Sequence, residues 1–169
     1  IGIQISQGYT NFELDVYLKE LFGIRLIGFA ITTALCLFIQ VLFNNKYVGY
    51  FFSIFFMILV PVLFGYLELD NKMYRFNSSG PTLPYSDMNG YGHGISSYIV
   101  FKSYWFMFAL ILMTVSMLFF VRSKEKGFKD RLKIARTRIS KGHLLVLTFS
   151  FIGFASFGSY IYYNIKVLN

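Results

Sequence analysis

The sequence predicts an all-α protein, a polytopic bundle of transmembrane helices, and three observations lead to this prediction. The 169 residues are 56% apolar and only 14% charged, whereas soluble domains are about 45–50% apolar and about 25% charged. With 21 Phe and 13 Tyr, a soluble fold would lack the polar residues to cover its core. The apolar residues also form four long uncharged runs without the two-residue alternation of a membrane β-barrel strand.

The four runs each have the length of a membrane-spanning helix. A hydrocarbon core about 30 Å thick needs about 20 helical residues, and backbone groups cannot stay unpaired in lipid, which favours helices. Arg25 and Lys102 are expected to snorkel from the ends of the first and third helices. The predicted spans are residues 21–45, 48–67, 99–121 and 144–164.

The first two spans should form an antiparallel hairpin, because only Asn44, Asn45 and Lys46 separate their apolar runs. Pro61 lies inside the second span, where it removes a backbone donor and should bend the helix. Such a bend could act as a hinge in a transporter. It also occurs in structural spans, where neighbouring groups replace the lost bond. Pro61 is therefore a candidate hinge, with a structural role as the alternative.

A shorter amphipathic helix is predicted before the first span. Thr10 and Glu13 have the spacing of a capping box. Residues 11–22 then combine apolar and charged side chains with helical periodicity. The helix either lies on the membrane surface before a turn at Gly23, or it extends the first span as a protruding helix.

The distribution of positive charge predicts the orientation of the bundle. Four crossings place residues 44–47 and 122–143 on one side, and both chain ends and the loop 68–98 on the other. The first side carries ten Lys and Arg, and the second carries four besides Arg25 and Lys102. Cytoplasmic loops are enriched in Lys and Arg, so we expect the basic loop inside and both chain ends outside. This clustering explains the net charge of +8 without a nucleic-acid partner.

The basic cytoplasmic loop, residues 122–143, is predicted to contain a second amphipathic helix. Phe128, Leu132, Ala135 and Ile139 recur at helical spacing and form one apolar stripe. The basic residues around the stripe are Lys129, Arg131, Lys133, Arg136, Arg138 and Lys141. Such a helix could lie against the anionic head groups of the lipid bilayer or form a docking surface for a cytoplasmic partner. The residues alone favour lipid contact.

The outer loop, residues 68–98, is expected to be packed and to contact another domain. Its candidate contact residues are Tyr85, Asp87, Asn89 and His93. Three of these could ligate a metal, but no second His or Cys stands at a binding spacing. The start of a calcium loop at Asp87 also lacks its closing acidic residue. We therefore expect no metal and no cofactor in this segment.

Catalytic signatures are missing from the sequence. It has no phosphate-binding loop, no zinc-peptidase motif and no serine nucleophile elbow, so we expect no enzyme in this segment. Within the apolar runs the polar residues are Ser, Thr and Gln, none of which ionises. A self-contained ion-driven transporter is disfavoured for that reason. The single cysteine, Cys36, excludes an internal disulfide.

Five motifs in a particular order resemble a known family. They are Tyr85–His93 (YSDMNGYGH), Phe101–Ala109, Leu118–Arg122, Arg131–Arg138 and Tyr163–Asn169. This order is similar to the membrane region of Bacteroidetes proteins related to type-2 ABC exporter permeases, in which a periplasmic zinc aminopeptidase-like domain follows the membrane part. The resemblance implies a bacterial inner membrane, in which the side that the charge count predicts as outside, with both ends of this segment, is the periplasm. It also implies a separate cytoplasmic ATPase subunit as partner, and remaining spans from the same chain or a homodimer.

Three functions stay open at this point. The segment is expected to be a permease domain that an ATPase drives, a membrane anchor for a periplasmic aminopeptidase-like domain, or a structural membrane subunit. Because it begins at Ile1 without Met or a signal pattern, we expect it to be an internal piece of a longer chain.

Overall fold

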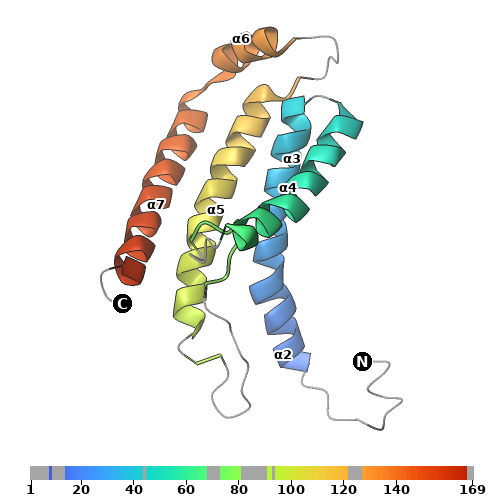
Figure 1. Cartoon of the computed structure of the whole chain (residues 1–169). Helices are drawn as coiled ribbons and strands as arrows, with labels where there is room; N and C mark the ends of the chain where they lie inside the picture. The colour runs from blue at the N-terminus through green and yellow to red at the C-terminus, as the bar shows by residue number, and fades with distance from the viewer. Residues whose placement is uncertain are drawn as a thin grey trace.

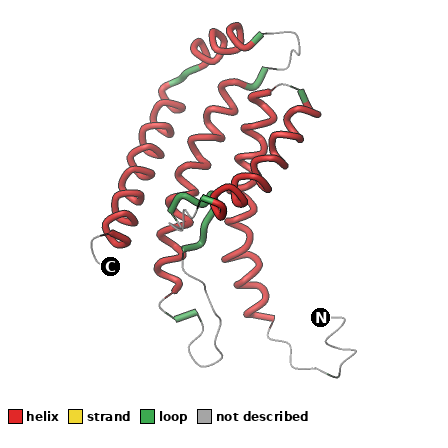
Figure 2. The backbone as a smooth tube through the Cα atoms, viewed as in Figure 1, coloured by secondary structure: helices red, strands yellow, loops and turns green. Residues whose placement is uncertain are grey.

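The computed structural model describes residues 8, 14–43, 45–67, 73–80, 91–92, 94–121 and 127–166. Its elements in chain order are α2 (Leu14–Leu18), the π-helix η1 (Lys19–Arg25), α3 (Leu26–Phe43), α4 (Lys46–Tyr66), α5 (Gly94–Phe119), α6 (Phe128–Arg138) and α7 (Lys141–Lys166). These described residues form helices and turns and contain no strand (Figure 2). The predicted all-α class is confirmed.

Among the residues that the structure describes, four helical segments are long and apolar enough to cross a membrane. They are Val16–Phe43, Lys46–Tyr66, Gly94–Phe119 and Lys141–Lys166. At about 1.5 Å per residue, the 21 residues of α4 cover about 31 Å, close to the thickness of a hydrocarbon core. The other three are longer, so part of each extends beyond a core of that thickness. The chain has the architecture of a multi-pass membrane protein.

The segment before the first span continues it without a turn. Helix α2, the π-helix η1 and α3 follow one another directly from Leu14 to Phe43, and Gly23 lies inside η1. The structure therefore selects the protruding helix over a surface helix that turns at Gly23. The capping pair Thr10 and Glu13 lies outside the described residues.

Helix α5 lies at the centre of the packing. It packs against α3 and α7, and α3 packs in turn against α4, so the long helices form a series α4–α3–α5–α7 (Figure 1). Helix α3 is antiparallel to α4, and α5 is antiparallel to α7, whereas α3 and α5 run in the same direction. The main core cluster consists of Ile31, Ala34, Phe101, Tyr104, Trp105, Ala109 and Ile161. Tyr104 stacks on Phe154 with 4.4 Å between ring centroids, which joins α5 to α7.

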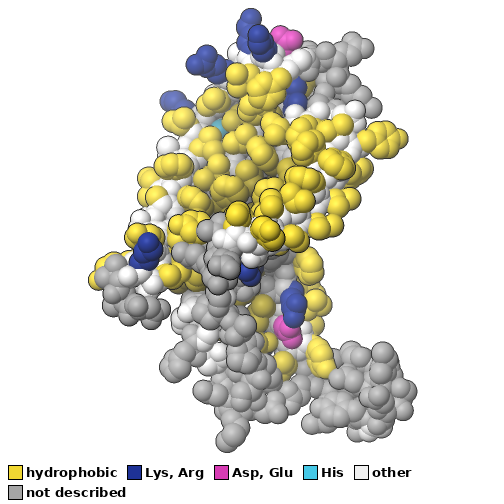
Figure 3. Space-filling model, in the orientation of Figure 1, with side chains coloured by type: hydrophobic (Ala, Val, Ile, Leu, Met, Phe, Trp, Pro, Cys, Tyr) yellow, Lys and Arg dark blue, Asp and Glu magenta, His cyan; other side chains and the backbone are white. Residues whose placement is uncertain are grey.

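The outer surface of the bundle is strongly apolar. On α4 the side chains of Phe51 and Ile58 are 62% and 63% exposed, and on α7 those of Phe149 and Ile152 are 61% and 65% exposed. Figure 3 shows hydrophobic side chains covering the face of the bundle, with Lys and Arg gathered over α6 at one end. A continuous apolar surface of this extent is typical of a membrane or interaction surface.

Candidate functional site

The predicted basic helix is present as α6, and it lies across one end of the bundle. At this end α3 and α5 finish while α4 and α7 begin (Figure 1). Of the predicted apolar stripe, only Ala135 is buried, at 4% exposure. Phe128, Leu132 and Ile139 are 55%, 50% and 46% exposed. Most of the stripe therefore remains available to lipid or to a partner.

Arg131 ties α6 to the ends of two membrane helices. Its side chain is buried at 3% exposure. Its guanidinium donates hydrogen bonds to the carbonyls of Val41 and Leu42 at the end of α3 and to that of Phe119 at the end of α5. The last four carbonyls of a helix have no partner within the helix, and a cation there also interacts favourably with the helix dipole. Arg131 thus caps both helices at once.

The basic residues predicted as one contact surface divide into two groups. Arg131 is buried against the bundle, and Arg138, although exposed, donates from Nη1 to the carbonyl of Phe120 at 2.5 Å. This placement corrects the grouping of Arg131 with the accessible residues. On α6, Lys129, Lys133 and Arg136 are exposed, and their spacing of four and three residues puts them on one helical face. That face is opposite the one that carries Arg131 and Ala135. Lys141 is exposed at the start of α7.

The predicted contact residues of the outer loop lie outside the described residues. This applies to Tyr85, Asp87, Asn89 and His93. Within the described part of the chain no group of three or more His, Cys, Asp or Glu is placed to hold a metal ion. The described part of this loop, residues 73–80, instead contributes to a polar cluster that is not apparent in the sequence.

Asn77 is the hub of this polar cluster at the end of the bundle opposite α6. Its side-chain nitrogen donates to the carbonyl of Gly28 at 2.8 Å and to Oγ1 of Thr32 at 3.0 Å, both on α3. Its side-chain oxygen and its backbone oxygen both accept from Nζ of Lys102 on α5. The backbone of Asn77 has φ of 57°, a left-handed conformation that Asn tolerates better than most residues. The residue therefore joins the loop to two helices.

Lys102 is buried within the protein and does not snorkel. Its side chain is 6% exposed, and Nζ lies 2.8 Å from the Asn77 carbonyl and 2.7 Å from Oδ1. Lys102 is the ninth residue of α5, which begins at Gly94, so it lies within the helix and not at its end. The expectation that no ionisable residue lies inside the spans is therefore corrected by this amine.

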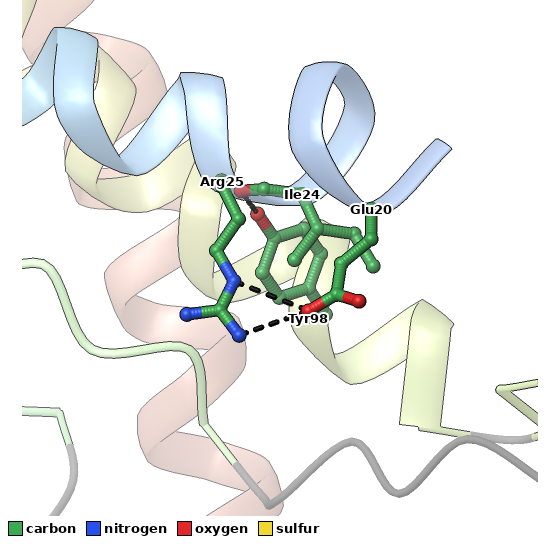
Figure 4. A network of polar contacts seen from close by, with 4 residues as sticks. All are labelled: Glu20, Ile24, Arg25 and Tyr98. Carbon is green, nitrogen blue, oxygen red and sulfur yellow. Dashed lines mark hydrogen bonds and ion pairs between the residues drawn. The ribbon is translucent and has the colours of Figure 1, made fainter. Parts of the chain in front are cut away.

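A second set of polar contacts lies beside the first. Arg25 donates to Oε1 of Glu20 from Nη2 at 2.9 Å and from Nε at 3.3 Å. These residues are five positions apart, and the wider winding of the π-helix, with its i to i+5 bonds, turns them toward one another. The hydroxyl of Tyr98 on α5 donates to the carbonyl of Ile24. Figure 4 shows these four residues together at the junction of η1 and α5.

Two adjoining cavities surround the cluster. The first has a volume of about 690 Å³ and is lined by Glu20, Arg25, Thr32, Asn77, Tyr98 and Lys102 among others. The second, of about 360 Å³, shares Thr32, Met57 and Asn77 with the first. Its remaining wall is mostly apolar and includes the predicted hinge Pro61. Helix α4 continues through Pro61 from Lys46 to Tyr66, and whether it flexes there stays a prediction.

Arg131 and Lys102, the two basic residues that are buried in the described part of the chain, share one pattern in the sequence: each lies among apolar residues on one face of its helix. Arg131 stands three residues after Phe128 and four before Ala135, on the apolar side of its helix. Lys102 stands four residues after Tyr98 and three before Trp105, again among apolar neighbours. A cation on the apolar face of a helix must find partners within the fold.

In comparisons with known proteins, no family model, no curated protein and no solved structure matches the chain. The functional assignment therefore depends on the geometry and chemistry of its own residues.

Proposed function

We propose that the chain is a transmembrane permease domain of an exporter related to the type-2 ABC class, driven by a separate cytoplasmic ATPase. The main support for the proposal is the attachment of α6 to the ends of two membrane helices, α3 and α5. One buried guanidinium, that of Arg131, bonds to the ends of both α3 and α5. The opposite face of α6 presents Lys129, Lys133 and Arg136 to the surroundings.

This arrangement suits the transmission of movement from a partner to the spans. A protein that bound the exposed basic face would displace α6, and the hydrogen bonds of Arg131 would carry the displacement to two spans together. Because a guanidinium forms several bonds in a fixed plane, such a connection is stiffer than one made by a lysine. The order of motifs that resembles exporter permeases also favours an ATPase as this partner.

The orientation in the proposal follows from charge. With the basic loop inside, α6 is cytoplasmic, and Asn77 and Lys102 lie at the periplasmic side of a bacterial inner membrane. Both ends of the segment are then periplasmic, where an aminopeptidase-like domain would emerge. The remaining spans would come from the same chain or from a second copy.

The test is copurification of the ATPase with the intact protein. We expect a subunit with a phosphate-binding Gly-x-x-x-x-Gly-Lys-Ser/Thr motif to be recovered with the wild type, along with ATP hydrolysis. Replacing Lys133 and Arg136 with Gln should lower this recovery at least about tenfold, because both charges belong to the exposed face of α6. Membrane insertion should persist, since the inner side keeps eight positive residues against four outside.

The matched control replaces Lys19 and Lys166 with Gln at the opposite end of the bundle. This double variant removes the same charge and should leave recovery of the ATPase unchanged. Equal recovery from the α6 variant would contradict docking on this face. A wild-type protein that purifies intact without any ATPase would contradict the permease and favour the membrane anchor.

A further inference from the structure

Lys102 is a buried cation that lacks a counter-ion among the residues that the structure describes. Its ammonium has three donors, and two of them bond to the neutral oxygens of Asn77. The carboxylate in the same cavity, Glu20, is already paired with Arg25 at 2.9 Å. An ionised amine in a membrane helix is expensive unless it is paired, and it commonly marks a functional site. A ligand that brings negative charge would complete this environment.

The first cavity has the size and chemistry to receive a phosphate group. Its volume of about 690 Å³ is bordered by Lys102, by the ion pair of Arg25 and Glu20, and by the hydroxyl-bearing residues Thr32 and Tyr98, so its charged groups sum to one positive charge. Arg25 uses Nε and Nη2 for Glu20, which leaves Nη1 for an anion. Gly28 also lines this cavity, and a Cβ atom at that position would lie 3.6 Å from Nζ of Lys102, an ordinary van der Waals contact.

The second cavity has the chemistry of an acyl-chain site. The helix α4 supplies Phe56, Met57, Val60, Pro61 and Phe64 to its wall, and the rest is lined by Phe76 and by the polar residues Thr32, Arg75, Asn77 and Ser78. Met57 borders both cavities and is 44% exposed on the outer surface of α4. The first cavity, which holds Lys102, and the second cavity, called the apolar groove below, therefore adjoin in the same way as the head group and the acyl chain of a lipid. A soluble anion would leave the groove empty.

We propose that these two cavities bind one anionic phospholipid from the leaflet opposite α6. Its phosphate lies between Lys102 and Arg25, and one acyl chain lies along α4 beside Pro61. The lipid is a resident ligand that supplies the charge missing beside Lys102. This inference stands apart from the proposed function, since it needs neither an ATPase nor transport.

The single tryptophan of the chain provides a local probe. Trp105 lies one turn from Lys102 on α5, and its ring contacts that of Phe76 with 5.1 Å between centroids. Phe76 itself lines the apolar groove. A bromine atom on an acyl chain in the groove would therefore quench the fluorescence of Trp105 at short range.

The experiment compares two brominated lipids in phosphatidylcholine vesicles that contain the full chain. Dibrominated phosphatidylglycerol should quench Trp105 more strongly than dibrominated phosphatidylcholine at equal mole fraction. Lys102→Met should lower this preference about fivefold, as expected for the loss of one cation near an anionic lipid. Lys166→Met removes a positive charge from the same end of the bundle, outside both cavities, and should leave the preference unchanged.

Three results would overturn the proposal. They are equal quenching by the two lipids in the wild type, full preference for phosphatidylglycerol in Lys102→Met, and displacement of the brominated lipid by millimolar inorganic phosphate, which would indicate a small-anion site. Arg25→Gln keeps the test decisive if Lys102→Met does not fold, because the Arg25 side chain is 65% exposed. This variant should also lose part of the preference, and an unchanged preference in it would count against the site.

Discussion

Replacing Arg131 with Met should destabilise the bundle by about 3 kcal/mol, the size expected when buried acceptors lose a charged donor. The carbonyls of Val41, Leu42 and Phe119 would remain at the ends of α3 and α5 without their present partner. Helix α6 would also lose its main polar attachment. The measurement is the free energy of unfolding in bicelles, followed by the fluorescence of Trp105, which lies in the core of α5.

Two further variants at this end separate attachment from charge. Arg131→Lys should fall between the wild type and Arg131→Met, because a lysine keeps the charge but lacks the planar fork that reaches several carbonyls. Arg136→Met removes the same charge from the exposed face of α6 and should change the free energy of unfolding by less than about 0.5 kcal/mol. Equal stability of Arg131→Met and Arg136→Met would contradict the capping role of Arg131.

Replacing Asn77 with Ala should lower the free energy of unfolding by about 3 kcal/mol, for two separable reasons. The side chain loses its bonds to Gly28, Thr32 and Lys102, which accounts for about 2 kcal/mol. The backbone at this position is left-handed, with φ of 57°. Alanine has a Cβ atom but no polar side chain to bond locally, so this conformation should lower the stability by about 1 kcal/mol more.

Asn77→Gly isolates the contribution of the hydrogen bonds. Glycine adopts the left-handed conformation without strain, so this variant should be more stable than Asn77→Ala by about 1 kcal/mol. It should still be less stable than the wild type. The same unfolding measurement in bicelles compares all three proteins. A glycine variant as stable as the wild type would show that the bonds of Asn77 do not hold the loop to α3 and α5.

The spans could be predicted from composition because lipid imposes a strong and local requirement on each helix. The predicted second span, residues 48–67, nearly coincides with α4, Lys46–Tyr66. The predicted third span, residues 99–121, starts five residues after α5 does. The missed residues 94–98 include Gly94, Ser96 and Ser97, which lower the local hydropathy although the helix continues through them. Hydropathy therefore locates the apolar part of the span and not the start of the helix.

The polar cluster could not be predicted, because its members come together only in the fold. Asn77 is 49 residues from Gly28 and 25 residues from Lys102 along the chain. Nothing in the local sequence distinguishes this asparagine from others in polar loops. For Arg131 the sequence did contain a signal, its position on the apolar side of α6. The abundance of neighbouring cations nevertheless suggested a single basic surface.

The most direct test of the proposed function is the accessibility of the two ends of the bundle, since docking of a cytoplasmic ATPase on α6 requires four crossings with α6 inside. Single cysteines replace Ser96 at the start of α5 and Ser140 beside α6, both of them exposed, in a Cys36→Ala background. With α6 inside, a membrane-impermeant thiol reagent added to intact cells should label the cysteine at position 96. The cysteine at position 140 should react only after the membrane is permeabilised. Labelling at position 140 with protection at position 96 would show that the orientation is the opposite of the one proposed. Labelling of both cysteines in intact cells would show that no membrane separates the two positions.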